Sequence, residues 1–227
     1  MFDFKNDKEA EEYIKRLGVE YRFGCFSEKN PEVCQLLGDY LDAIKKDFEK
    51  AGKIYKTNCD EYNFPKSCHS YGNYALVGKG QEKGNVAVAY TYYSKACELG
   101  VAKSCLNAGL MDVNGSVSGR REKNLHKGVE SLDKACELGN DYACFYLAGI
   151  YMTDDIMQRD MKQAFKYSEK ACELGSMFAC SNLSIMYKKG EGVEKNEEMS
   201  QKMKKKADEI REEHESNLVI EFGRGSN

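Results

Sequence analysis

The chain has 227 residues, a formal net charge of −3 and ten cysteines. This length allows one or two compact domains, or one elongated array of repeats. The weak negative charge provides no general attraction to phosphate, so we expect no nucleic-acid partner. The apolar runs are far shorter than the roughly 18–20 residues that cross a membrane, so we expect no membrane span. Ten cysteines are many for a cytosolic protein and even in number, so disulfides have to be considered first.

The first predicted element is an acidic amphipathic helix over residues 1–20. Glycine commonly ends a helix, so we interpret Gly18 as the residue that ends this one. We expect this helix to cap the N-terminal end of the structure that follows. The segment lacks the apolar stretch of a secretory signal and the arginine-rich, acid-poor composition of a mitochondrial presequence. Its apolar face consists of Ala10, Tyr13, Ile14 and Leu17.

The cysteines in the next segment, residues 21–195, fall into five local couples. Eight residues separate the members of the first two couples and seven separate those of the last three, and the first members lie 34, 38, 39 and 36 positions apart. Such a period, with one couple in each unit, predicts a repeat array and favours pairing within each couple. The predicted disulfides are Cys25–Cys34, Cys59–Cys68, Cys97–Cys105, Cys136–Cys144 and Cys172–Cys180.

The sequence around the couples predicts two helices in each unit. The string Lys-Ala-Cys-Glu-Leu-Gly recurs unchanged at residues 95–100, 134–139 and 170–175, each time at the end of an amphipathic stretch. Its glycine is typical of the left-handed residue that follows a helix. The second cysteine of each couple then opens a new apolar periodicity. We therefore expect an all-α fold without β-sheet, in which each unit is a helix, a short loop and a second helix.

The only two prolines support this register. Pro31 and Pro65 each lie three residues before the second cysteine of their couple, and proline is tolerated in the first turn of a helix. A disulfide that closes a loop of about nine residues stabilises by roughly 2–3 kcal/mol. The alternative is ten free cysteines that serve as small core residues. The gaps do not match those of zinc sites, so we expect no metal.

The last predicted helix covers residues 196–216 and caps the C-terminal end of the array. A basic run at Lys202 and Lys204–Lys206 is interpreted as a solvated face that nearby glutamates balance. Residues 217–227 are predicted to form a flexible tail. The narrow apolar face of the helix consists of Met199, Met203, Ala207 and Ile210.

Two motifs were considered as sites of chemistry. Ser131 and Lys134 match the Ser-x-x-Lys pattern of serine β-lactamases, but its partner motifs are missing, so the match is interpreted as chance. The three histidines, His69, His126 and His214, are scattered through the chain. His69 follows Cys68 and is a weak candidate for a haem ligand. We expect no catalytic residue, because no nucleophile is accompanied by a base.

Fifteen tyrosines are the remaining compositional feature. Most are expected to pack in the core or between repeats, with the hydroxyl reaching a polar partner. The rest are available to line a surface that a helical array presents to an extended or helical ligand. The tyrosines at repeat positions include Tyr71, Tyr74, Tyr93, Tyr151 and Tyr187.

Several segments resemble the Sel-one-like repeat, a relative of the tetratricopeptide repeat. Residues 142–151 and 178–193 are similar to the first helix of that repeat, the latter with its Gly-x-Gly turn, and residues 78–80 are similar to the same turn. The cysteine couples place the resemblance in the cysteine-rich branch of the family, which includes secreted bacterial proteins once called β-lactamases and assembly factors of animal cytochrome c oxidase. The resemblance implies a right-handed α/α solenoid of about five tetratricopeptide-like helical hairpins stapled by disulfides.

The resemblance also implies a function. It points to a non-enzymatic scaffold or chaperone-like factor for the assembly of mitochondrial respiratory-chain complex IV, with oxidase subunits or other assembly factors as clients and a monomeric state. It implies residence in the mitochondrial intermembrane space, with the disulfide-relay oxidoreductase as a partner during import. The residues themselves leave two other compartments open, namely secretion from a bacterium after loss of a leader, and reducing cytosol with free thiols.

An alternative is a haem-binding or thiol-redox carrier, or a weak β-lactamase-like hydrolase. Local pairing leaves no cysteine over for redox chemistry, which favours the scaffold. We expect no resident cofactor, and haem is the one cofactor that the sequence leaves open.

Overall fold

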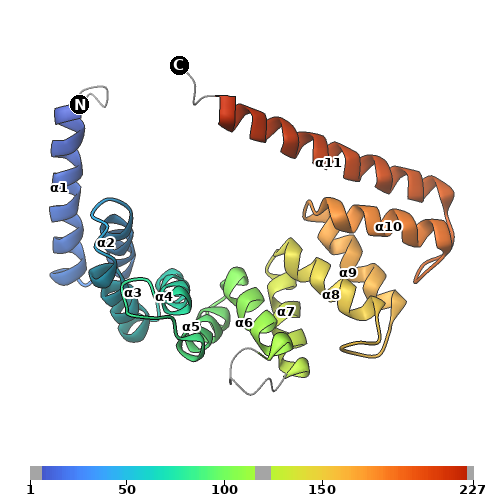
Figure 1. Cartoon of the computed structure of the whole chain (residues 1–227), viewed down its shortest axis with the longest axis horizontal. Helices are drawn as coiled ribbons and strands as arrows, with labels where there is room; N and C mark the ends of the chain where they lie inside the picture. The colour runs from blue at the N-terminus through green and yellow to red at the C-terminus, as the bar shows by residue number, and fades with distance from the viewer. Residues whose placement is uncertain (1–6, 116–123, 224–227) are drawn as a thin grey trace. The chain divides into compact units, whose positions relative to one another are not determined.

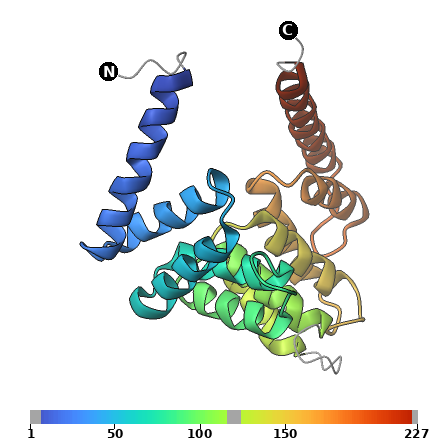
Figure 2. The ribbon, with the colours of Figure 1, turned by 60° about the vertical axis from the view of Figure 1, so that its left-hand side comes forward.

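A computed structural model describes residues 7–115 and 124–223 of the chain, with side chains described up to Ser216. Within these ranges every regular element is an α-helix (Figures 1 and 2). None of the helices in these ranges combines the length and apolar character needed to cross a membrane. The helices are α1 (Asp7–Phe26), α2 (Pro31–Ala43), α3 (Phe48–Tyr62), α4 (Pro65–Val77), α5 (Val86–Glu98), α6 (Ala102–Asn114), α7 (Leu125–Glu137), α8 (Asp141–Met152), α9 (Met161–Glu173), α10 (Met177–Lys189) and α11 (Glu197–Gly223).

The predicted all-α fold class is confirmed over the described part of the chain. The chain divides into two compact units, of which the first contains α1 to α5 with the start of α6, and the second contains the rest of α6 and α7 to α11. In the first unit, each of the helices α1 to α4 packs against the helix that follows it in the chain. In the second unit, each of the helices α7 to α10 does the same. Packing between sequence neighbours is the arrangement expected of helical hairpins in an array.

The loops between paired helices satisfy the backbone at both helix ends. Gly139 follows α7 with a φ of +86°, in the left-handed region that favours glycine, and its N–H donates to the carbonyl of Cys136 at 3.1 Å. The side chain of Asn140 then accepts from the N–H of Ala143 at 2.9 Å and so caps α8. α2 and α4 begin at Pro31 and Pro65, so both prolines lie in the first turn of a helix, as predicted. Local signals of this kind therefore set the hairpin boundaries.

A disulfide ties the two helices of each hairpin together. In the four whose geometry is described, the Cα atoms lie 4.6 to 4.8 Å apart, within the range that a disulfide requires. Cys97 and Cys105 are disulfide-bonded as well, so no cysteine of the chain is free. The four bonds with described geometry are Cys25–Cys34, Cys59–Cys68, Cys136–Cys144 and Cys172–Cys180.

The predicted N-terminal helix over residues 1–20 is wrong in its C-terminal boundary, and its residues 1–6 lie outside the described residues. α1 continues through Gly18 to Phe26 and carries Cys25, so it is the first helix of the first hairpin. Gly18 is buried inside the helix, where an added Cβ would lie 2.6 Å from Cζ of Tyr40. The glycine permits close approach of Tyr40 from α2 and does not end the helix.

The same glycine–tyrosine contact recurs between later helices of the first unit. A Cβ on Gly38 of α2 would collide with the ring of Tyr55 on α3, and a Cβ on Gly72 of α4 would lie 2.7 Å from the ring of Tyr93 on α5. Because glycine has no side chain, each tyrosine ring packs directly against the backbone of the neighbouring helix. The predicted packing role is confirmed for most repeat-position tyrosines, since the following are at most 9% exposed: Tyr71, Tyr74, Tyr93 and Tyr187.

The C-terminal helix packs as predicted but ends later than predicted. α11 begins at Glu197, packs against α10 and continues to Gly223, because no glycine or proline interrupts the chain before that residue. The prediction of a tail from residue 217 is therefore wrong up to Gly223, and residues 224–227 lie outside the described residues. On the basic run, Lys205 pairs with Glu209 at 3.4 Å on an exposed surface, consistent with a solvated face. The residues expected to form the apolar face are at least half-buried: Met199, Met203, Ala207 and Ile210.

Candidate protein-binding groove

The Ser-x-x-Lys match lies within the packed face of a helix. Ser131 and Lys134 are one turn apart on α7, and Leu132 between them is fully buried. Lys134 occupies the register of Lys95 in the repeated string, and Lys95 donates from Nζ to the carbonyl of Cys59 at 2.8 Å. In the first unit, the repeated lysine is thus explained by a hydrogen bond to the C-terminal end of α3, the first helix of the preceding hairpin.

His69 is half-buried on α4, and both of its ring nitrogens have hydrogen-bond partners. Nδ1 lies 2.7 Å from Oγ of Ser104, and Nε2 lies 3.2 Å from Nδ2 of Asn73. Burial, together with the nearby charge of Lys103, holds the pKa of His69 below its ordinary value. The adjacent Cys68 is fully buried and bonded to Cys59. To bind a metal ion, His69 would therefore have to give up one of these two hydrogen bonds.

The other candidates do not gather with His69. His126 lies on α7, where it is exposed and 3.2 Å from Glu130, and His214 is exposed on α11. Within the described ranges, no three side chains of His, Cys, Asp or Glu come together in a way that could hold a metal ion. The predicted site residues therefore remain distributed over the fold.

Sequence reasoning missed a buried polar network that joins α2, α3 and α4. Asn58 donates from Nδ2 to Oγ of Ser67 at 2.7 Å and to the carbonyl of Pro31 at 2.8 Å. Ser67 in turn donates to Oε1 of Gln35 at 2.7 Å. Asn58 and Ser67 each precede a cysteine of the same couple, which is the one signal that marks them in the sequence. Oδ1 of Asn58 is buried without a hydrogen-bond partner among the described residues. The three bonds that are made link α3 to α2 and α4 and so help to fix how one hairpin meets the next.

Tyrosine hydroxyls connect neighbouring hairpins through carboxylates. Tyr74 donates to Asp42 at 2.6 Å, and Lys79, in the middle of the Gly-x-Gly turn, pairs with the same carboxylate at 2.5 Å. Burial alone would raise the pKa of Asp42, but these two bonds outweigh burial and hold that pKa below its ordinary value. Burial and the carboxylate together raise the pKa of Tyr74. Asp42 is therefore charged at neutral pH, and its bonds to Tyr74 and Lys79 anchor the turn to α2.

A groove lies in the first unit where α1, α2 and α3 meet. The disulfide of Cys25 and Cys34 holds the C-terminal end of α1 against the first turn of α2. Phe26, the last residue of α1, follows this bond directly. Beyond the other end of α2, Asp47 caps α3 by accepting from the backbone N–H of Lys50 at 3.2 Å. These local bonds fix the three helices that form the groove.

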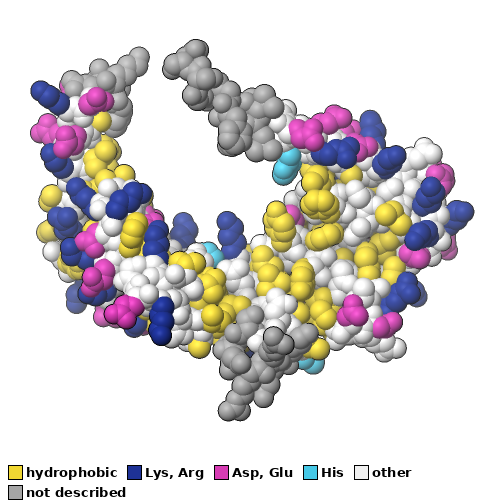
Figure 3. Space-filling view, viewed as in Figure 1, with side chains coloured by type: hydrophobic (Ala, Val, Ile, Leu, Met, Phe, Trp, Pro, Cys, Tyr) yellow, Lys and Arg dark blue, Asp and Glu magenta, His cyan; other side chains and the backbone are white. Residues whose placement is uncertain are grey.

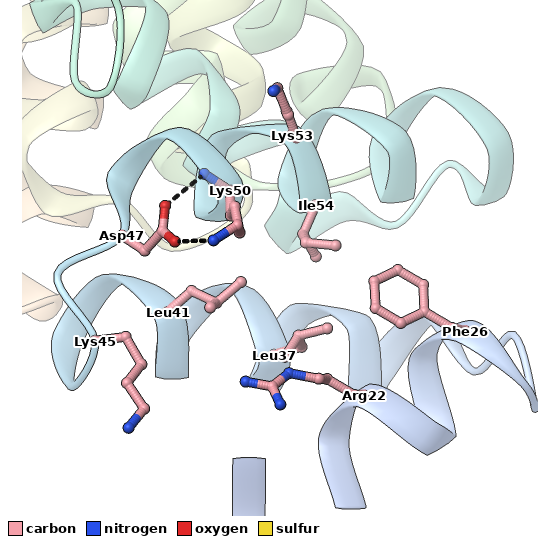
Figure 4. Close-up of a pocket in the computed structure, with 9 residues that line it drawn as sticks. All are labelled: Arg22, Phe26, Leu37, Leu41, Lys45, Asp47, Lys50, Lys53 and Ile54. Atoms are coloured by element: carbon pink, nitrogen blue, oxygen red, sulfur yellow. Dashed lines mark hydrogen bonds and ion pairs between the residues drawn. The ribbon is translucent and has the colours of Figure 1, made fainter. Parts of the chain in front are cut away.

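The first part of the groove is a cavity of about 620 Å³ with an apolar centre. Figure 4 shows Leu37 and Leu41 on α2 facing Ile54 on α3, with Phe26 beside them. Leu37 and Leu41 are 1% and 7% exposed and form the floor, whereas Phe26 is 61% exposed. The charged residues that line this cavity are Arg22, Lys45, Asp47, Lys50 and Lys53.

The second part is a cavity of about 400 Å³ that shares Phe26, Lys53 and Ile54 with the first. It passes the disulfide of Cys25 and Cys34 and continues along α3. Because three residues line both cavities, the two adjoin along α3, and together they are called the groove. The remaining residues that line the second part are Lys29, Thr57, Asn58, Glu61 and Tyr62.

The groove carries the opposite charge to the whole chain. Its lining contains five cations and two anions, a formal balance of +3, whereas the full chain has a net charge of −3. The two anions are Asp47 and Glu61. On the surface seen in Figure 3, Lys and Arg side chains stand among hydrophobic ones over the N-terminal helices. An apolar cavity with a basic rim is suited to an anionic, partly apolar ligand.

Comparison with protein families agrees with a unit of two helices, but each family repeat begins one helix later than a disulfide-tied hairpin. The family model described as Sel1 repeat matches residues 65–101, 102–140, 141–176 and 178–207, which together make more than half of the chain. The chain belongs to the Sel1 repeat family. The resemblance drawn from the sequence is thereby confirmed. Each matched Sel1 repeat begins with the helix that carries the second cysteine of a couple, so the last three disulfides each link one matched repeat to the next.

This Sel1 repeat chain is similar to curated proteins that share one name. It is 49% identical over 154 residues to "cytochrome c oxidase assembly factor 7 homolog" of Drosophila melanogaster, an alignment that covers 67% of this chain and 58% of the fly protein. It is 40% identical over 172 residues to "cytochrome c oxidase assembly factor 7" of Xenopus tropicalis, with 74% of each chain covered. The aligned part thus spans less than two thirds of the fly relative.

Solved structures of other Sel1 repeat proteins share the fold. A Sel1 repeat protein from Oxalobacter formigenes has a TM-score of 0.75 at 23% identity, covering 89% of this chain and 83% of that one. A protective antigen of uropathogenic Escherichia coli has a TM-score of 0.72 at 24% identity, covering 86% of this chain and 40% of that one. At this level of identity the likeness concerns the fold alone.

Proposed function

We propose that this protein is a non-enzymatic scaffold that supports the assembly of cytochrome c oxidase in mitochondria. The observation that carries the proposal is the likeness to proteins named cytochrome c oxidase assembly factor 7, which reaches 49% identity with the fly protein and covers 74% of the frog protein. A scaffold acts by holding a client in a defined position. Its clients would be subunits of the oxidase or other assembly factors.

The structure supports holding in preference to chemistry. All ten cysteines are disulfide-bonded, and a cysteine in a disulfide supplies no thiolate for redox or nucleophilic chemistry. The first unit also presents a preformed elongated groove with a basic rim. Its walls are fixed by a disulfide, a helix cap and a buried polar network. A rigid surface of this kind binds with little loss of conformational entropy.

We propose the mitochondrial intermembrane space as the site of action. Five disulfides persist in an oxidising compartment and are rare in reducing cytosol. A protein that acts on the oxidase and contains five disulfides is suited to the compartment in which the disulfide relay operates. The relay oxidoreductase would then be a transient partner that forms these bonds during import.

A deletion and rescue experiment in cells of the source organism tests this function. Removal of the protein should lower the amount of assembled cytochrome c oxidase on native gels, together with its activity, and leave the other respiratory complexes near their normal amounts. Re-expression of the wild-type chain should restore the oxidase. Normal oxidase in the deletion strain, or an equal loss of all complexes, would overturn the proposal.

A further inference from the structure

The groove of the first unit has the length and shape of a site for a short helix. α3 lines both cavities with residues that recur at helical spacing from Lys50 to Tyr62. At a rise of about 1.5 Å per residue, this span is roughly 18 Å long. A partner helix of about 12 residues, or three turns, would occupy it. Helices bound in such grooves present apolar side chains at positions i, i+3, i+4 and i+7.

The apolar surface of the groove continues onto an exposed face of α1. Val19, Phe23 and Phe26 lie at i, i+4 and i+7 spacing and are 62%, 60% and 61% exposed. Side chains at this spacing share one face of a helix. The end of a repeat array normally carries a polar outer face, and clustered exposed apolar residues mark interaction surfaces. The face of α1 next to the groove therefore has the character of an interface.

The cations at the rim indicate the charge of the occupant. Arg22, Lys29 and Lys45 form no ion pair within the described part of the chain. Lys50 and Lys53 pair with carboxylates on or next to their own helix, in exposed positions where such pairs contribute little. A ligand with carboxylates on either side of an apolar stripe would complement this rim.

We propose that this groove binds an acidic amphipathic helix of a partner protein. Its apolar stripe would enter between Phe26 and Ile54 and reach Leu37 on the floor, and its Asp and Glu side chains would face Arg22 and Lys45. Leu37 on the floor is 1% exposed and Phe26 on the rim is 61% exposed, so the floor lies below the rim. Side chains that protrude from a helix enter such a cavity, whereas a flat membrane surface contacts only the rim. The proposal deepens the proposed function and rests on it for the identity of the partner as a client of oxidase assembly.

Binding of a designed peptide to the full chain tests this proposal directly. The probe is a fluorescein-labelled helix of about 12 residues, with leucines in one stripe and glutamates beside it. A scrambled peptide of the same composition and a version with lysine in place of glutamate serve as probe controls. Fluorescence anisotropy should show that the acidic amphipathic peptide binds about tenfold or more tightly than either control.

Matched variants locate the binding. Phe26→Asp and Lys45→Glu should each lower the affinity for the acidic peptide by about tenfold or more. Val77→Asp, at a position 70% exposed and outside the groove, and Lys204→Glu on the exposed face of α11 should leave affinity unchanged. Circular dichroism verifies the fold of each variant. Should Phe26→Asp fail to fold, Lys45→Glu alone decides.

Four results would overturn the proposal. Two concern the peptides: equal affinity for all three peptides, or control variants that lose as much affinity for the acidic peptide as Phe26→Asp and Lys45→Glu do. The other two point to another occupant: preferential binding to vesicles of phosphatidylcholine and cardiolipin, or a wild-type dimer in sedimentation that Phe26→Asp dissociates. Failure of this proposal is distinguishable from failure of the proposed function. A deletion strain that keeps normal oxidase contradicts the function alone, whereas peptide binding that survives Phe26→Asp and Lys45→Glu contradicts the groove alone.

Discussion

Substitution of Gly38 by alanine tests whether close glycine–tyrosine contacts position the helices. A Cβ at this position would lie 2.7 Å from Cδ1 of Tyr55 and 2.9 Å from its Cζ, well inside the 3.5–4.0 Å at which carbon atoms attract. The ring of Tyr55 has little freedom to move away. It is 2% exposed, its hydroxyl donates to Asp39 at 2.7 Å, and it packs edge-on against Tyr74 at 5.3 Å between centroids.

Two opposing effects set the magnitude. Overpacking in a core costs about 1–3 kcal/mol. Because the ring of Tyr55 is held in place, we expect the cost of Gly38→Ala to lie near the upper end of that range. Replacement of glycine by alanine inside a helix contributes about 1 kcal/mol of stabilisation. We therefore expect the free energy of unfolding to fall by about 2 kcal/mol. Gly149 on α8 is the matched control, because it is exposed and nothing lies within 4 Å of an added Cβ.

Urea titration and thermal melting followed by circular dichroism measure both variants. Gly149→Ala should raise the free energy of unfolding by about 0.5–1 kcal/mol, and Gly38→Ala should lower it, with a fall in Tm of about 2–4 °C per kcal/mol. Equal stabilisation by both substitutions would show that the ring of Tyr55 moves away from the added methyl group without loss of stability. That result would refute the role of these contacts in fixing the helix positions.

Three further predictions concern the loops, the disulfides and one buried histidine. Gly139→Ala forces a left-handed φ onto a residue with a Cβ and should cost about 1–2 kcal/mol in urea titration, although nothing else contacts that position. The double variant Cys136→Ser and Cys144→Ser should lose about 2–5 kcal/mol, and an unchanged Tm would contradict the stapling role. Because burial, with the charge of Lys103, lowers the pKa of His69, the unfolded chain binds its proton more readily, and the free energy of unfolding should fall as pH drops below about 6.5. His69→Gln should flatten this dependence in urea titrations between about pH 7 and pH 5, and an identical slope in the variant would contradict the assignment.

The hairpins could be predicted from the sequence because their signals are local. The proline at the start of α2, the glycine after α7 and the cysteine spacing each act within a few residues. The sequence does not reveal the role of Gly18, because a glycine that ends a helix and a glycine that packs against a tyrosine look alike in sequence. The distinction depends on Tyr40, which approaches from another helix.

The groove could not be predicted because it exists only where three helices meet. Leu37 and Leu41 read as ordinary core residues of α2, and the cavity above them depends on the positions of α1 and α3. Phe23 and Phe26 lie beyond the predicted end of the first helix at residue 20, so the prediction does not place them on one helical face with Val19. The buried network of Asn58 was hidden for the same reason, since its partners lie on other helices.

Disulfide mapping of the protein isolated from mitochondria tests the central claim, a scaffold held in shape by local disulfides in an oxidising compartment. The protein would be alkylated in denaturant without reductant, digested and examined by mass spectrometry. The account predicts no alkylated cysteine and five cross-linked peptide pairs, each joining the two members of one couple. Ten alkylated cysteines, or pairs that join cysteines of different couples, would contradict it.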